Sequence, residues 1–344
     1  MNLLDHIKTN KTYVIAEMSA NHGGSFKHAI EIVHAAKEAG ADCLKIQTYT
    51  ADTLTIDCRN DNFIVKGGLW AGSNLHDLYK NAYTPWEWQP KIKDECDKIG
   101  LDFLSTPFDK TSVDFLEDMN VGAYKIASPE LIDIPLIKYV ASKGKPMLIS
   151  CGMGSEQEIH DAINAMKSKN LKNYILLKCC SEYPSNYINM NLSLITDMQK
   201  RFNCLVGLSD HSMGSLGVIV AVALGAKVVE KHFCISRKDN TADSEFSMEF
   251  EEFKSMVQDI RNVELVCGKP VYGPSEGEKR GLRNRRSLFA VKEIRKGEVL
   301  TEKNVRSIRP GQGLPPKFYD QVIGKKAKED ITFGTPLNWD LVED

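Results

Sequence analysis

Residues 13–47 read YVIAEMSANHGGSFKHAIEIVHAAKEAGADCLKIQ, and this stretch decides the fold class. It begins with the β-type run Tyr13–Glu17 and ends with a second one, Cys43–Gln47. Between them, residues 28–41 place apolar side chains near i, i+3, i+4 and i+7, which is the spacing of an amphipathic helix. Gly40 closes this pattern, as a glycine does past the end of a helix. The stretch therefore predicts a strand–helix–strand unit with parallel strands.

The same alternation continues along the chain. Six further β-type runs bring the total to eight, and they are Leu101–Ser105, Ala123–Ala127, Pro146–Ser150, Tyr174–Cys179, Cys204–Leu208 and Val228–His232. Eight strand–helix units over about 250 residues are typical of a (β/α)8, or TIM, barrel. A doubly wound α/β sheet is the competing architecture, but the first strand–helix turn reads NHGGS and lacks the GxGxxG fingerprint. We predict an α/β TIM barrel over residues 1–267.

The pattern changes after the barrel. Residues 268–282 are rich in turn-forming residues and are interpreted as a linker. Residues 283–344 carry a weak internal repeat, because residues 293–305 (EIRKGEVLTEKNV) and 330–342 (DITFGTPLNWDLV) share Ile, Gly, Leu and Val at offsets zero, three, six and eleven. Two copies of a turn-and-strand unit predict a small, mainly β domain with pseudo-symmetry. A domain of this size gains from packing against another surface.

Composition excludes several classes of protein. The 344 residues include 44 Lys plus Arg and 46 Asp plus Glu, for a formal net charge of −2, which argues against a general nucleic-acid binder. A hydrophobic share of 42% excludes whole-chain disorder. No run of about 18 apolar residues predicts a membrane helix, and the opening MNLLDHIKTNKTY has no apolar secretory core. Nine cysteines without a CxxC pair indicate a reducing cytoplasm, with no structural disulfide or zinc ribbon.

One connection is unusually long. Residues 50–83 separate the second predicted strand from its helix, and residues 67–88 read GGLWAGSNLHDLYKNAYTPWEW. Loops of this length are usually lids or binding loops, and loops that follow strands lie on the active face of a barrel. The alternative is a surface excursion with its own small core. We expect the segment to contribute to a binding site.

Polar side chains stand at the end of every predicted strand. In a barrel these ends converge on the active site. Lysines together with short hydroxyls are suited to a phosphate and a carboxylate, so the ring predicts a small, multiply anionic substrate. The candidates are Glu17, Asn21, His22, Lys45, Gln47, Thr106, Lys125, Ser128, Glu130, Ser150, Lys178, Ser181, Tyr183, Ser209, Asp210, His211, Glu230, Lys231 and His232.

Two of these candidates could ligate a metal. His211 and His232 follow the neighbouring strands seven and eight, and two imidazoles with an acid and open positions suit a divalent transition metal. Asp243 is a candidate for the acid. Two structural histidines are the alternative, and the sequence leaves both interpretations open. A nucleophile is less favoured, because no GxSxG elbow is present and the Cys179-Cys180 pair is interpreted as buried small hydrophobes.

Seven motifs resemble, in this order, the sialic acid synthase family: AEMSANHGG, KIQTYTAD, FLSTPFD, YKIASPE, ISCGM, GLSDHS and EKHF. The resemblance covers nearly the whole chain, including a tail that is similar to the antifreeze-like (SAF) domain of those enzymes. It implies condensation of phosphoenolpyruvate with a 2-acetamido sugar to a nine-carbon ulosonic acid. Residues 67–88 and STPFDK resemble most the branch that makes pseudaminic acid from 2,4-diacetamido-2,4,6-trideoxy-L-altrose. The N-acetylneuraminate and legionaminate branches are the alternatives.

The resemblance also implies roles for individual residues. It assigns acid/base catalysis to Glu17, and it assigns contacts with phosphoenolpyruvate to the lysines Lys45 and Lys125 and to Thr106, Ser128, Ser150 and Ser209. The implied sugar contacts are Gln47, Tyr183, Asp243 and Arg309, and Glu130 falls on another polar position of the active site. The implied ligands of a divalent ion, which would be Mn2+, Mg2+ or Co2+, are His211 and His232.

The predicted sugar lacks a 6-hydroxyl and carries a second acetamido group, so it is comparatively apolar. Four aromatic residues of the long connection could provide a matching surface, namely Trp70, Tyr79, Tyr83 and Trp86. Two positions depart from the family pattern. The usual NHNG reads NHGG, which removes a possible asparagine contact. Ser181 stands where the neuraminate enzymes have an asparagine, and this agrees with a different sugar.

Residues 279–309 contain eleven basic and three acidic residues. Such a run is usually a solvated face or a nucleic-acid patch, but this one has a single aromatic residue, Phe289, instead of a series of interleaved aromatics for stacking on bases. The resemblance implies instead a domain-swapped homodimer, in which Arg309 reaches the sugar bound by a second subunit. We therefore expect small-molecule substrates and a second copy of the chain as partners, with neither nucleic acid nor membrane.

Two other classes of function are alternatives to this synthase. One is a binding protein whose barrel has lost activity and whose tail binds carbohydrate or ice. The intact set of strand-end lysines, histidines and Glu17 argues against it. The other is a Schiff-base aldolase, which needs a lysine of low pKa. Lysines beside a phosphate are expected to stay charged instead.

Overall fold

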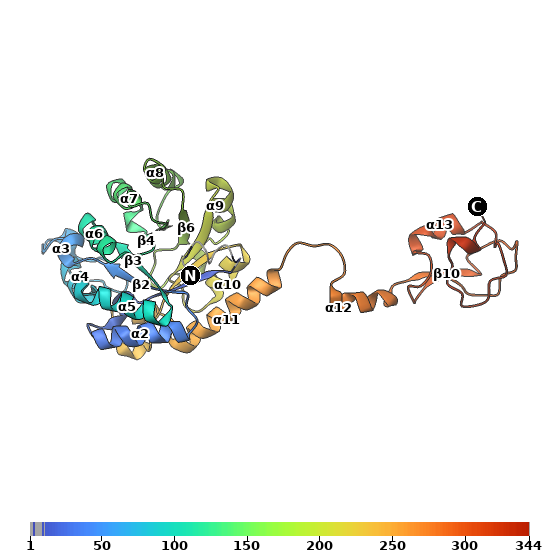
Figure 1. Ribbon diagram of the computed structural model, residues 1–344, viewed down its shortest axis with the longest axis horizontal. Helices are drawn as coiled ribbons and strands as arrows, with labels where there is room; N and C mark the ends of the chain where they lie inside the picture. Colours follow the sequence, from blue (N-terminus) through green and yellow to red (C-terminus); the bar gives the residue numbers. More distant parts are fainter. Residues whose placement is uncertain (1–2, 4–8, 10, 344) are drawn as a thin grey trace. The chain divides into compact units, whose positions relative to one another are not determined.

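The computed structural model describes residues 3, 9 and 11–343. Most of the first ten residues, where the sequence indicates no secretory segment, lie outside the described residues. The chain divides into two compact units, Met1–Gly268 and Lys269–Asp344, and each is described by itself (Figure 1). Within the described part of the chain, no helix has both the length and the apolar character needed to cross a membrane. All nine cysteines are free thiols.

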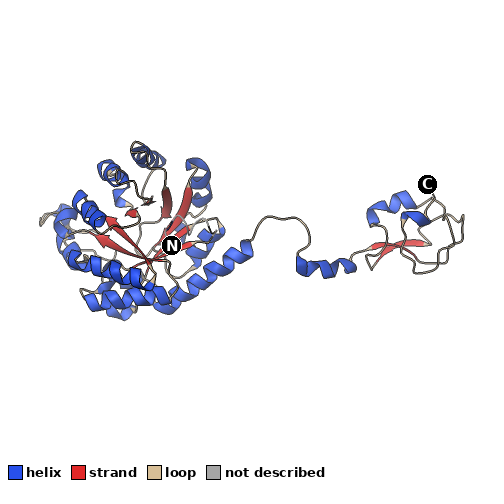
Figure 2. Ribbon diagram, in the orientation of Figure 1, coloured by secondary structure: helices blue, strands red, loops and turns tan. Residues whose placement is uncertain are grey.

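The first unit is a closed barrel of eight parallel strands in chain order, with helices around it (Figure 2), so the predicted architecture is confirmed. Three predicted strands have the predicted bounds, and the other five differ by one or two residues at an end. The strands are β1 (Tyr13–Glu17), β2 (Cys43–Thr48), β3 (Asp102–Pro107), β4 (Tyr124–Ile126), β5 (Met147–Ser150), β6 (Tyr174–Cys179), β7 (Leu205–Asp210) and β8 (Val228–His232).

The helix that follows β1, α2 (Phe26–Glu38), shows why these segments are helical. The Ser25 hydroxyl accepts a hydrogen bond from the amide of His28 and so caps the N-terminus. Its buried residues recur at helical spacing, and Gly40 follows its end with φ +90°. The helices of this unit are α2 (Phe26–Glu38), α3 (Ala51–Leu54), α4 (Leu75–Ala82), α5 (Gln89–Ile99), α6 (Lys110–Asp118), α7 (Ile134–Ala141), α8 (Glu156–Lys167), α9 (Leu194–Phe202), α10 (Leu216–Ala223) and α11 (Phe250–Cys267).

Side chains along each strand alternate between the barrel interior and the helices. Tyr13 and Ile15 of β1 belong to the inner apolar cluster, whereas Val14 and Ala16 pack with the helices. The same period of two continues to the strand ends, so it directs Glu17 into the barrel. The polar end of the barrel interior is therefore a direct consequence of strand geometry.

The long connection after β2 has secondary structure of its own. It contains α3 and α4, and Ile64 forms an antiparallel bridge with Asn74. The Asn74 side chain caps α4 by accepting from the amide of His76 at 3.0 Å. Trp70 Nε1 donates to the carbonyl of Ala242 at 3.1 Å, which fastens the connection to the loop after β8. The connection is thus a folded excursion held against the C-terminal side of the barrel.

The second unit contains the antiparallel pair β9 (Ser287–Ala290) and β10 (Val305–Ile308) and the short helices α12 (Glu276–Lys279) and α13 (Tyr319–Val322). The two copies of the sequence repeat meet at their first position. Ile294 and Ile331 exchange backbone hydrogen bonds of 2.9 and 2.7 Å. The glycines at offset three, Gly297 and Gly334, have φ values of +78° and +84°. The predicted pseudo-symmetry is therefore present.

The repeat generates a prediction for the second unit. Ile294 and Ile331 are only 1% and 2% exposed in its core. Changing either to alanine should destabilise this unit by about 2–5 kcal/mol, because each removes a buried side chain and leaves a cavity. Amide hydrogen exchange should accelerate in residues 283–343 and stay unchanged in the barrel. Phe333→Ala, at a side chain that is 69% exposed, is the matched control. Slow exchange throughout the Ile294→Ala variant would contradict the assignment.

Candidate active site

Two adjoining cavities open at the C-terminal end of the barrel. The smaller has a volume of about 60 Å³ and the larger about 410 Å³. Both are lined by Gln47, Phe108, Ala127, Pro129, Tyr183 and His232, so they form one continuous site. The smaller cavity is lined in addition by Cys179 and by eight more members of the predicted polar ring, namely Lys45, Thr106, Lys125, Ser128, Ser150, Ser209, His211 and Glu230.

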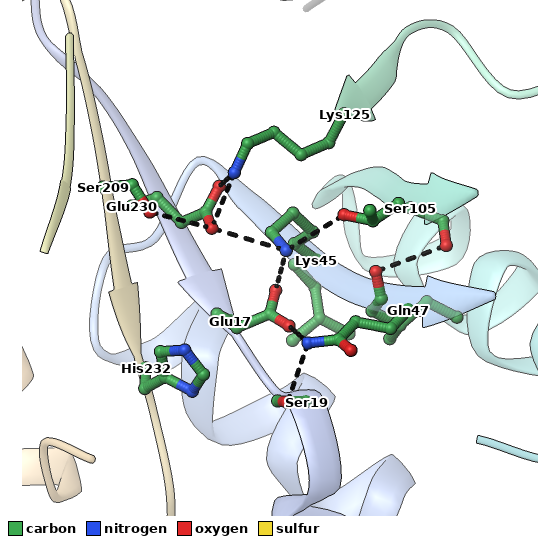
Figure 3. Close-up of polar contacts among 12 residues, drawn as sticks. Glu17, Ser19, Lys45, Gln47, Ser105, Lys125, Ser209, Glu230 and His232 are labelled. Carbon is green, nitrogen blue, oxygen red and sulfur yellow. Dashed lines mark hydrogen bonds and ion pairs between the residues drawn. The ribbon is translucent and has the colours of Figure 1, made fainter. Parts of the chain in front are cut away.

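Four buried charges of alternating sign form the floor of the site (Figure 3). Lys125 Nζ lies 2.8 and 3.0 Å from the two carboxylate oxygens of Glu230. Lys45 Nζ lies 2.7 Å from Glu17 Oε2 and 3.4 Å from Glu230 Oε1. It also donates to the Thr106 hydroxyl at 3.3 Å. Each of the four charged residues is at most 4% exposed, so water screens these contacts very little.

The two carboxyl groups of this cluster differ in acidity. Burial alone would raise the pKa of Glu230, but the ammonium groups of Lys125 and Lys45 lower it to about 2. Burial raises the pKa of Glu17, and the opposing effect of Lys45 does not cancel this increase. Two neighbouring carboxyls whose pKa values move apart have different roles. The lowered pKa of Glu230 suits a permanent counter-ion, and the raised pKa of Glu17 is the direction expected of a carboxyl that exchanges a proton.

The pKa values of the two lysines are shifted in opposite directions. Burial lowers the pKa of Lys125, and its ion pair with Glu230 only partly offsets that effect. For Lys45, the carboxylates of Glu17 and Glu230 outweigh burial, and the pKa rises. Gln47 fixes the position of Glu17, because its Nε2 donates to Glu17 Oε1 at 3.1 Å and to the Ser19 hydroxyl at 2.9 Å.

The two candidate metal ligands lie side by side, with ring centroids 5.4 Å apart. His211 Nδ1 is 2.9 Å from the carbonyl of Cys180, which leaves Nε2 for another contact. His232 Nδ1 is buried without a hydrogen-bond partner and lies 4.0 Å from Asp243 Oδ2. Burial lowers the pKa of His232 well below its ordinary value, which is the direction a metal ligand requires, whereas for His211 the Cys179 thiol outweighs burial and raises the pKa.

This arrangement fits a divalent ion. An imidazole nitrogen sits about 2.0–2.1 Å from a bound transition metal, so two rings on one ion have centroids roughly 5 Å apart. The observed separation of 5.4 Å between the two ring centroids is close to this value. His232 Nδ1, which has no hydrogen-bond partner, is available as a ligand atom. Among residues 3, 9 and 11–343, no group of three or more His, Cys, Asp or Glu side chains is already assembled for a metal. The metal ligands therefore stay a prediction.

Unpartnered polar atoms mark where a ligand belongs. Ser150 Oγ, Glu130 Oε2 and His232 Nδ1 are all buried and have no hydrogen-bond partner in the described structure. Buried polar atoms are normally hydrogen-bonded, and here all three line one or other of the two cavities. This concentration of unsatisfied atoms indicates a polar ligand.

The larger cavity has an aromatic wall formed by the long connection and its neighbours. Trp70 and Tyr79 line it together with Tyr49, Leu54, Val65, Leu75, Leu78, Tyr183, Glu130 and Asp243. Two of the four aromatics expected there are not among the lining residues. Trp86 packs against Phe115 with ring centroids 4.7 Å apart and donates Nε1 to the carbonyl of Tyr49, and Tyr83 ends α4. The sequence does not distinguish these packing aromatics from the two that line the cavity.

Several strand-end candidates have structural surroundings instead. Asn21 Nδ2 donates to the carbonyl of Phe233 at 3.0 Å, and His22 Nδ1 accepts from the amide of Gly24 at 3.0 Å. Lys178 Nζ donates to the carbonyl of Cys179. Arg309 belongs to the second unit, whose placement relative to the barrel is not determined, so its role stays a prediction.

Two ionisable residues that line the smaller cavity received no individual role from the sequence. Glu230 holds both lysines, and its inward direction could have been deduced from its position two residues before His232 in β8. Cys179 is buried, as expected for a small hydrophobe, but its sulfur lies 3.8 Å from His211 Nδ1. The imidazole outweighs burial and lowers the pKa of this thiol to about 7. No sequence pattern signals such a pairing.

A separate cavity of about 360 Å³ lies at the opposite end of the barrel, where Tyr13, Cys43 and Asp102 line it. Its residues come from the N-terminal ends of strands. That face of a (β/α)8 barrel contributes to stability, whereas chemistry occurs at the C-terminal face.

Glu130 gives the site a testable pH dependence. Burial raises the pKa of its carboxyl from 4.5 to about 7, so the folded protein disfavours its ionised form. The free energy of unfolding should therefore fall between those pH values, by up to about 3 kcal/mol. The Glu130→Gln variant has no carboxyl to ionise at this position. Its free energy of unfolding should therefore increase relative to that of the parent as the pH rises from 5 to 8. Urea unfolding of parent and variant at pH 5 and pH 8 measures this difference in the free energy of unfolding. Glu251→Gln, at an exposed position of α11, is the control. A constant difference between Glu130→Gln and parent would contradict the prediction.

Comparisons with known proteins agree with this geometry. A model described as the NeuB family matches residues 32–272, and one described as the SAF domain matches residues 285–343. The pseudaminic acid synthase of Campylobacter jejuni is 44% identical over 330 residues, which are 95% of each chain. That of Helicobacter pylori is 42% identical over 332 residues, covering 96% of this chain and 97% of that protein.

A solved structure is also similar. The N-acetylneuraminic acid (sialic acid) synthetase of Leptospira borgpetersenii superimposes with a TM-score of 0.72 at 30% identity, covering 79% of this chain and 90% of that one. The barrel, the polar ring and the matched tail thus agree with the resemblance found in the motifs. This chain belongs to the NeuB family of sialic acid synthases, and it ends in an SAF domain.

Proposed function

We propose that this protein is a pseudaminic acid synthase. It condenses phosphoenolpyruvate with 2,4-diacetamido-2,4,6-trideoxy-L-altrose and water, and it releases pseudaminic acid and phosphate. The observation that carries the proposal is the junction of a small cavity lined by lysines and hydroxyls with a larger aromatic one, above the buried Glu17 carboxyl. The 42–44% identity to two pseudaminic acid synthases supports the choice of sugar over the neuraminate branch, one solved member of which is 30% identical.

The smaller cavity suits phosphoenolpyruvate. Lys45 and Lys125 supply two positive charges, and the hydroxyls of Thr106, Ser150 and Ser209 supply short donors around them. In the free protein the Glu230 carboxylate forms ion pairs with both ammonium groups. A trianionic ligand would share them, and the unpartnered Ser150 hydroxyl would gain an acceptor.

The reaction forms a bond between C3 of phosphoenolpyruvate and the aldehyde carbon of the open-chain sugar. Water adds at C2, and the resulting tetrahedral centre expels phosphate. The Glu17 carboxyl, whose pKa is raised and whose position is fixed by Gln47, holds or moves the proton of that water. Lys45 and Lys125 keep the anionic groups in place, so positioning supplies part of the rate.

A divalent ion belongs to the same proposal. His211 and His232 would hold Mn2+, Mg2+ or Co2+, and such an ion supplies Lewis acidity toward a carbonyl oxygen. Asp243 Oδ2 lies 4.0 Å from His232 Nδ1, and Asp243 lines the larger cavity. It therefore joins Gln47, Tyr183 and Glu130 as a proposed contact of the sugar.

The aldolase alternative has one observation in its favour. Burial lowers the pKa of Lys125, which is the direction that a Schiff-base lysine requires. However, the 2.8 and 3.0 Å contacts with Glu230 hold this group as an ammonium ion. The paired Lys125 therefore favours the synthase.

The tail enters the proposal through Arg309. This residue is exposed in the second unit. We infer that it reaches the sugar bound by a second subunit in a domain-swapped homodimer. The nine free cysteines agree with a reducing cytoplasm as the location of the reaction.

The function is tested by phosphate release from phosphoenolpyruvate in the presence of Mn2+ and a panel of sugars. We expect the 2,4-diacetamido-L-altrose sugar to be used at least about 100-fold more efficiently than N-acetylmannosamine, because discrimination at several contacts multiplies. Lys45→Met and Lys125→Met should each lower kcat/KM by about tenfold or more. Preference for another sugar would reassign the branch, and a borohydride-stable adduct with pyruvate would support the aldolase.

Trp70 offers a sharper test of the sugar side. Trp70→Ala should lower kcat/KM for the diacetamido sugar by about tenfold, because a half-buried ring of the cavity's aromatic wall is lost. The KM for phosphoenolpyruvate should not change. Trp70→Phe keeps the ring but loses the bond to Ala242, and it should retain most of the activity. Equal losses for both substrates in Trp70→Ala would mean that the residue only stabilises the fold.

The homodimer is tested by mixing two inactive variants. Arg309→Ala and Glu17→Ala should each be inactive alone. After mixing, one site of each mixed dimer would contain both intact residues, so part of the activity should return. A mixture that stays inactive although mixed dimers form would show that Arg309 does not act across subunits.

A further inference from the structure

A second buried ion pair lies beside the candidate metal site. Lys231 Nζ is 2.7 Å from Asp210 Oδ2, and the two side chains are 1% and 0% exposed. Ser212 completes the group, because its amide donates to Asp210 Oδ1 at 2.9 Å and its hydroxyl to Asp210 Oδ2 at 3.1 Å. Lys231 Nζ also donates to the carbonyl of Ser212. All three residues are fully enclosed by protein.

The position of the pair follows from strand alternation. Leu208 of β7 and Val229 of β8 belong to the cluster between strands and helices. Two residues further along each strand, Asp210 and Lys231 share that outward direction, and they are directly paired in the sheet. The next residue in each case is a histidine that lines the inner cavity. The ion pair and the two imidazoles thus lie on opposite faces of the same two strand ends.

Stability gives no sufficient reason for this pair. Removing two charges from water is costly, and replacing a buried ion pair by neutral groups is often neutral or stabilising. The geometric consequence is more specific. Asp210 binds both Lys231 and Ser212, so it fixes the chain on both sides of His211 and ties it to the residue before His232.

We propose that the Asp210–Lys231 pair positions His211 and His232 for metal binding. The pair sets the distance between the two imidazoles from behind the sheet, without contacting the ion. This inference rests on the proposed metal site. Groups that orient metal ligands typically change metal affinity by about 10- to 100-fold when they are altered.

The test measures Mn2+ affinity without substrates, by the EPR signal of free Mn2+, and phosphoenolpyruvate affinity by calorimetry. The variant is the full chain with Asp210→Asn and Lys231→Met, which keeps an acceptor for the Ser212 amide and leaves no unpaired charge. We expect the Kd for Mn2+ to rise about 10- to 100-fold. The Kd for phosphoenolpyruvate should rise less than that for Mn2+, because β2 and β4 carry its lysines and only Ser209 and Glu230 of its proposed site adjoin the altered pair.

The chain offers a matched control at the opposite end of the barrel. Asp42 Oδ2 pairs with Arg261 Nη2 at 3.2 Å and accepts from the amide of Val14 at 2.9 Å. The same kind of change there, Asp42→Asn with Arg261→Met, should leave Mn2+ affinity unaltered. His211→Ala should abolish specific Mn2+ binding and so locate the measured site.

The outcomes separate the two proposals. Absence of Mn2+ binding by the parent would overturn the metal site and this inference with it. Mn2+ binding that requires His211 but is unaffected by the double change would overturn the positioning role alone. Parallel losses for Mn2+ and phosphoenolpyruvate would overturn it as well, because the pair would then support the barrel in general. If the double variant does not fold, the Ser212→Ala variant is measured instead, because it removes the hydroxyl that donates to Asp210. A Kd for Mn2+ about threefold above that of the parent supports the positioning role, and an unchanged Kd overturns it.

Discussion

The contact on which the site depends is the buried bridge from Lys125 through Glu230 to Lys45 and Glu17. Two ammonium and two carboxylate groups are withdrawn from water together, and each would be very costly to bury alone. Their strands are β4, β8, β2 and β1, and β1 pairs with both β8 and β2. The cluster can therefore form only when the barrel is closed, so the same closure that completes the fold assembles the chemistry.

Strand alternation explains how much of this was predictable. Eight β-type runs, the helical spacing between them and the polar strand ends are local features, and the structure confirms the eight strands within two residues. Glu230 was identified as a strand-end residue but not as the counter-ion of Lys125, because the two are 105 residues apart and meet across the barrel. The functions of Trp70 and Trp86 depend on packing, which local sequence does not encode. Both are tryptophans of one connection, yet only Trp70 lines the cavity.

The segment VVEKH of β8 shows how one strand serves two layers. Glu230 and His232 face the cavity, where Glu230 holds both lysines and His232 is a proposed metal ligand. Lys231 faces the other way, and an unpaired lysine between sheet and helices would destabilise the fold. Asp210, at the matching position of β7, removes that cost and at the same time joins the two strand ends.

Charge and polarity divide the site in a way that suits two unlike substrates. The smaller cavity is narrow and cationic at its floor, so a compact anion fits it better than a sugar does. The larger cavity has aromatic walls with two carboxyl groups, Glu130 and Asp243, whose pKa values burial raises. Carboxyls that hold protons more readily repel a neighbouring anion less and can donate hydrogen bonds to acetamido oxygens. Because the cavities meet at Gln47, Tyr183 and His232, the reacting carbons of both substrates would be brought together there, beside the Glu17 carboxyl that Gln47 holds in place.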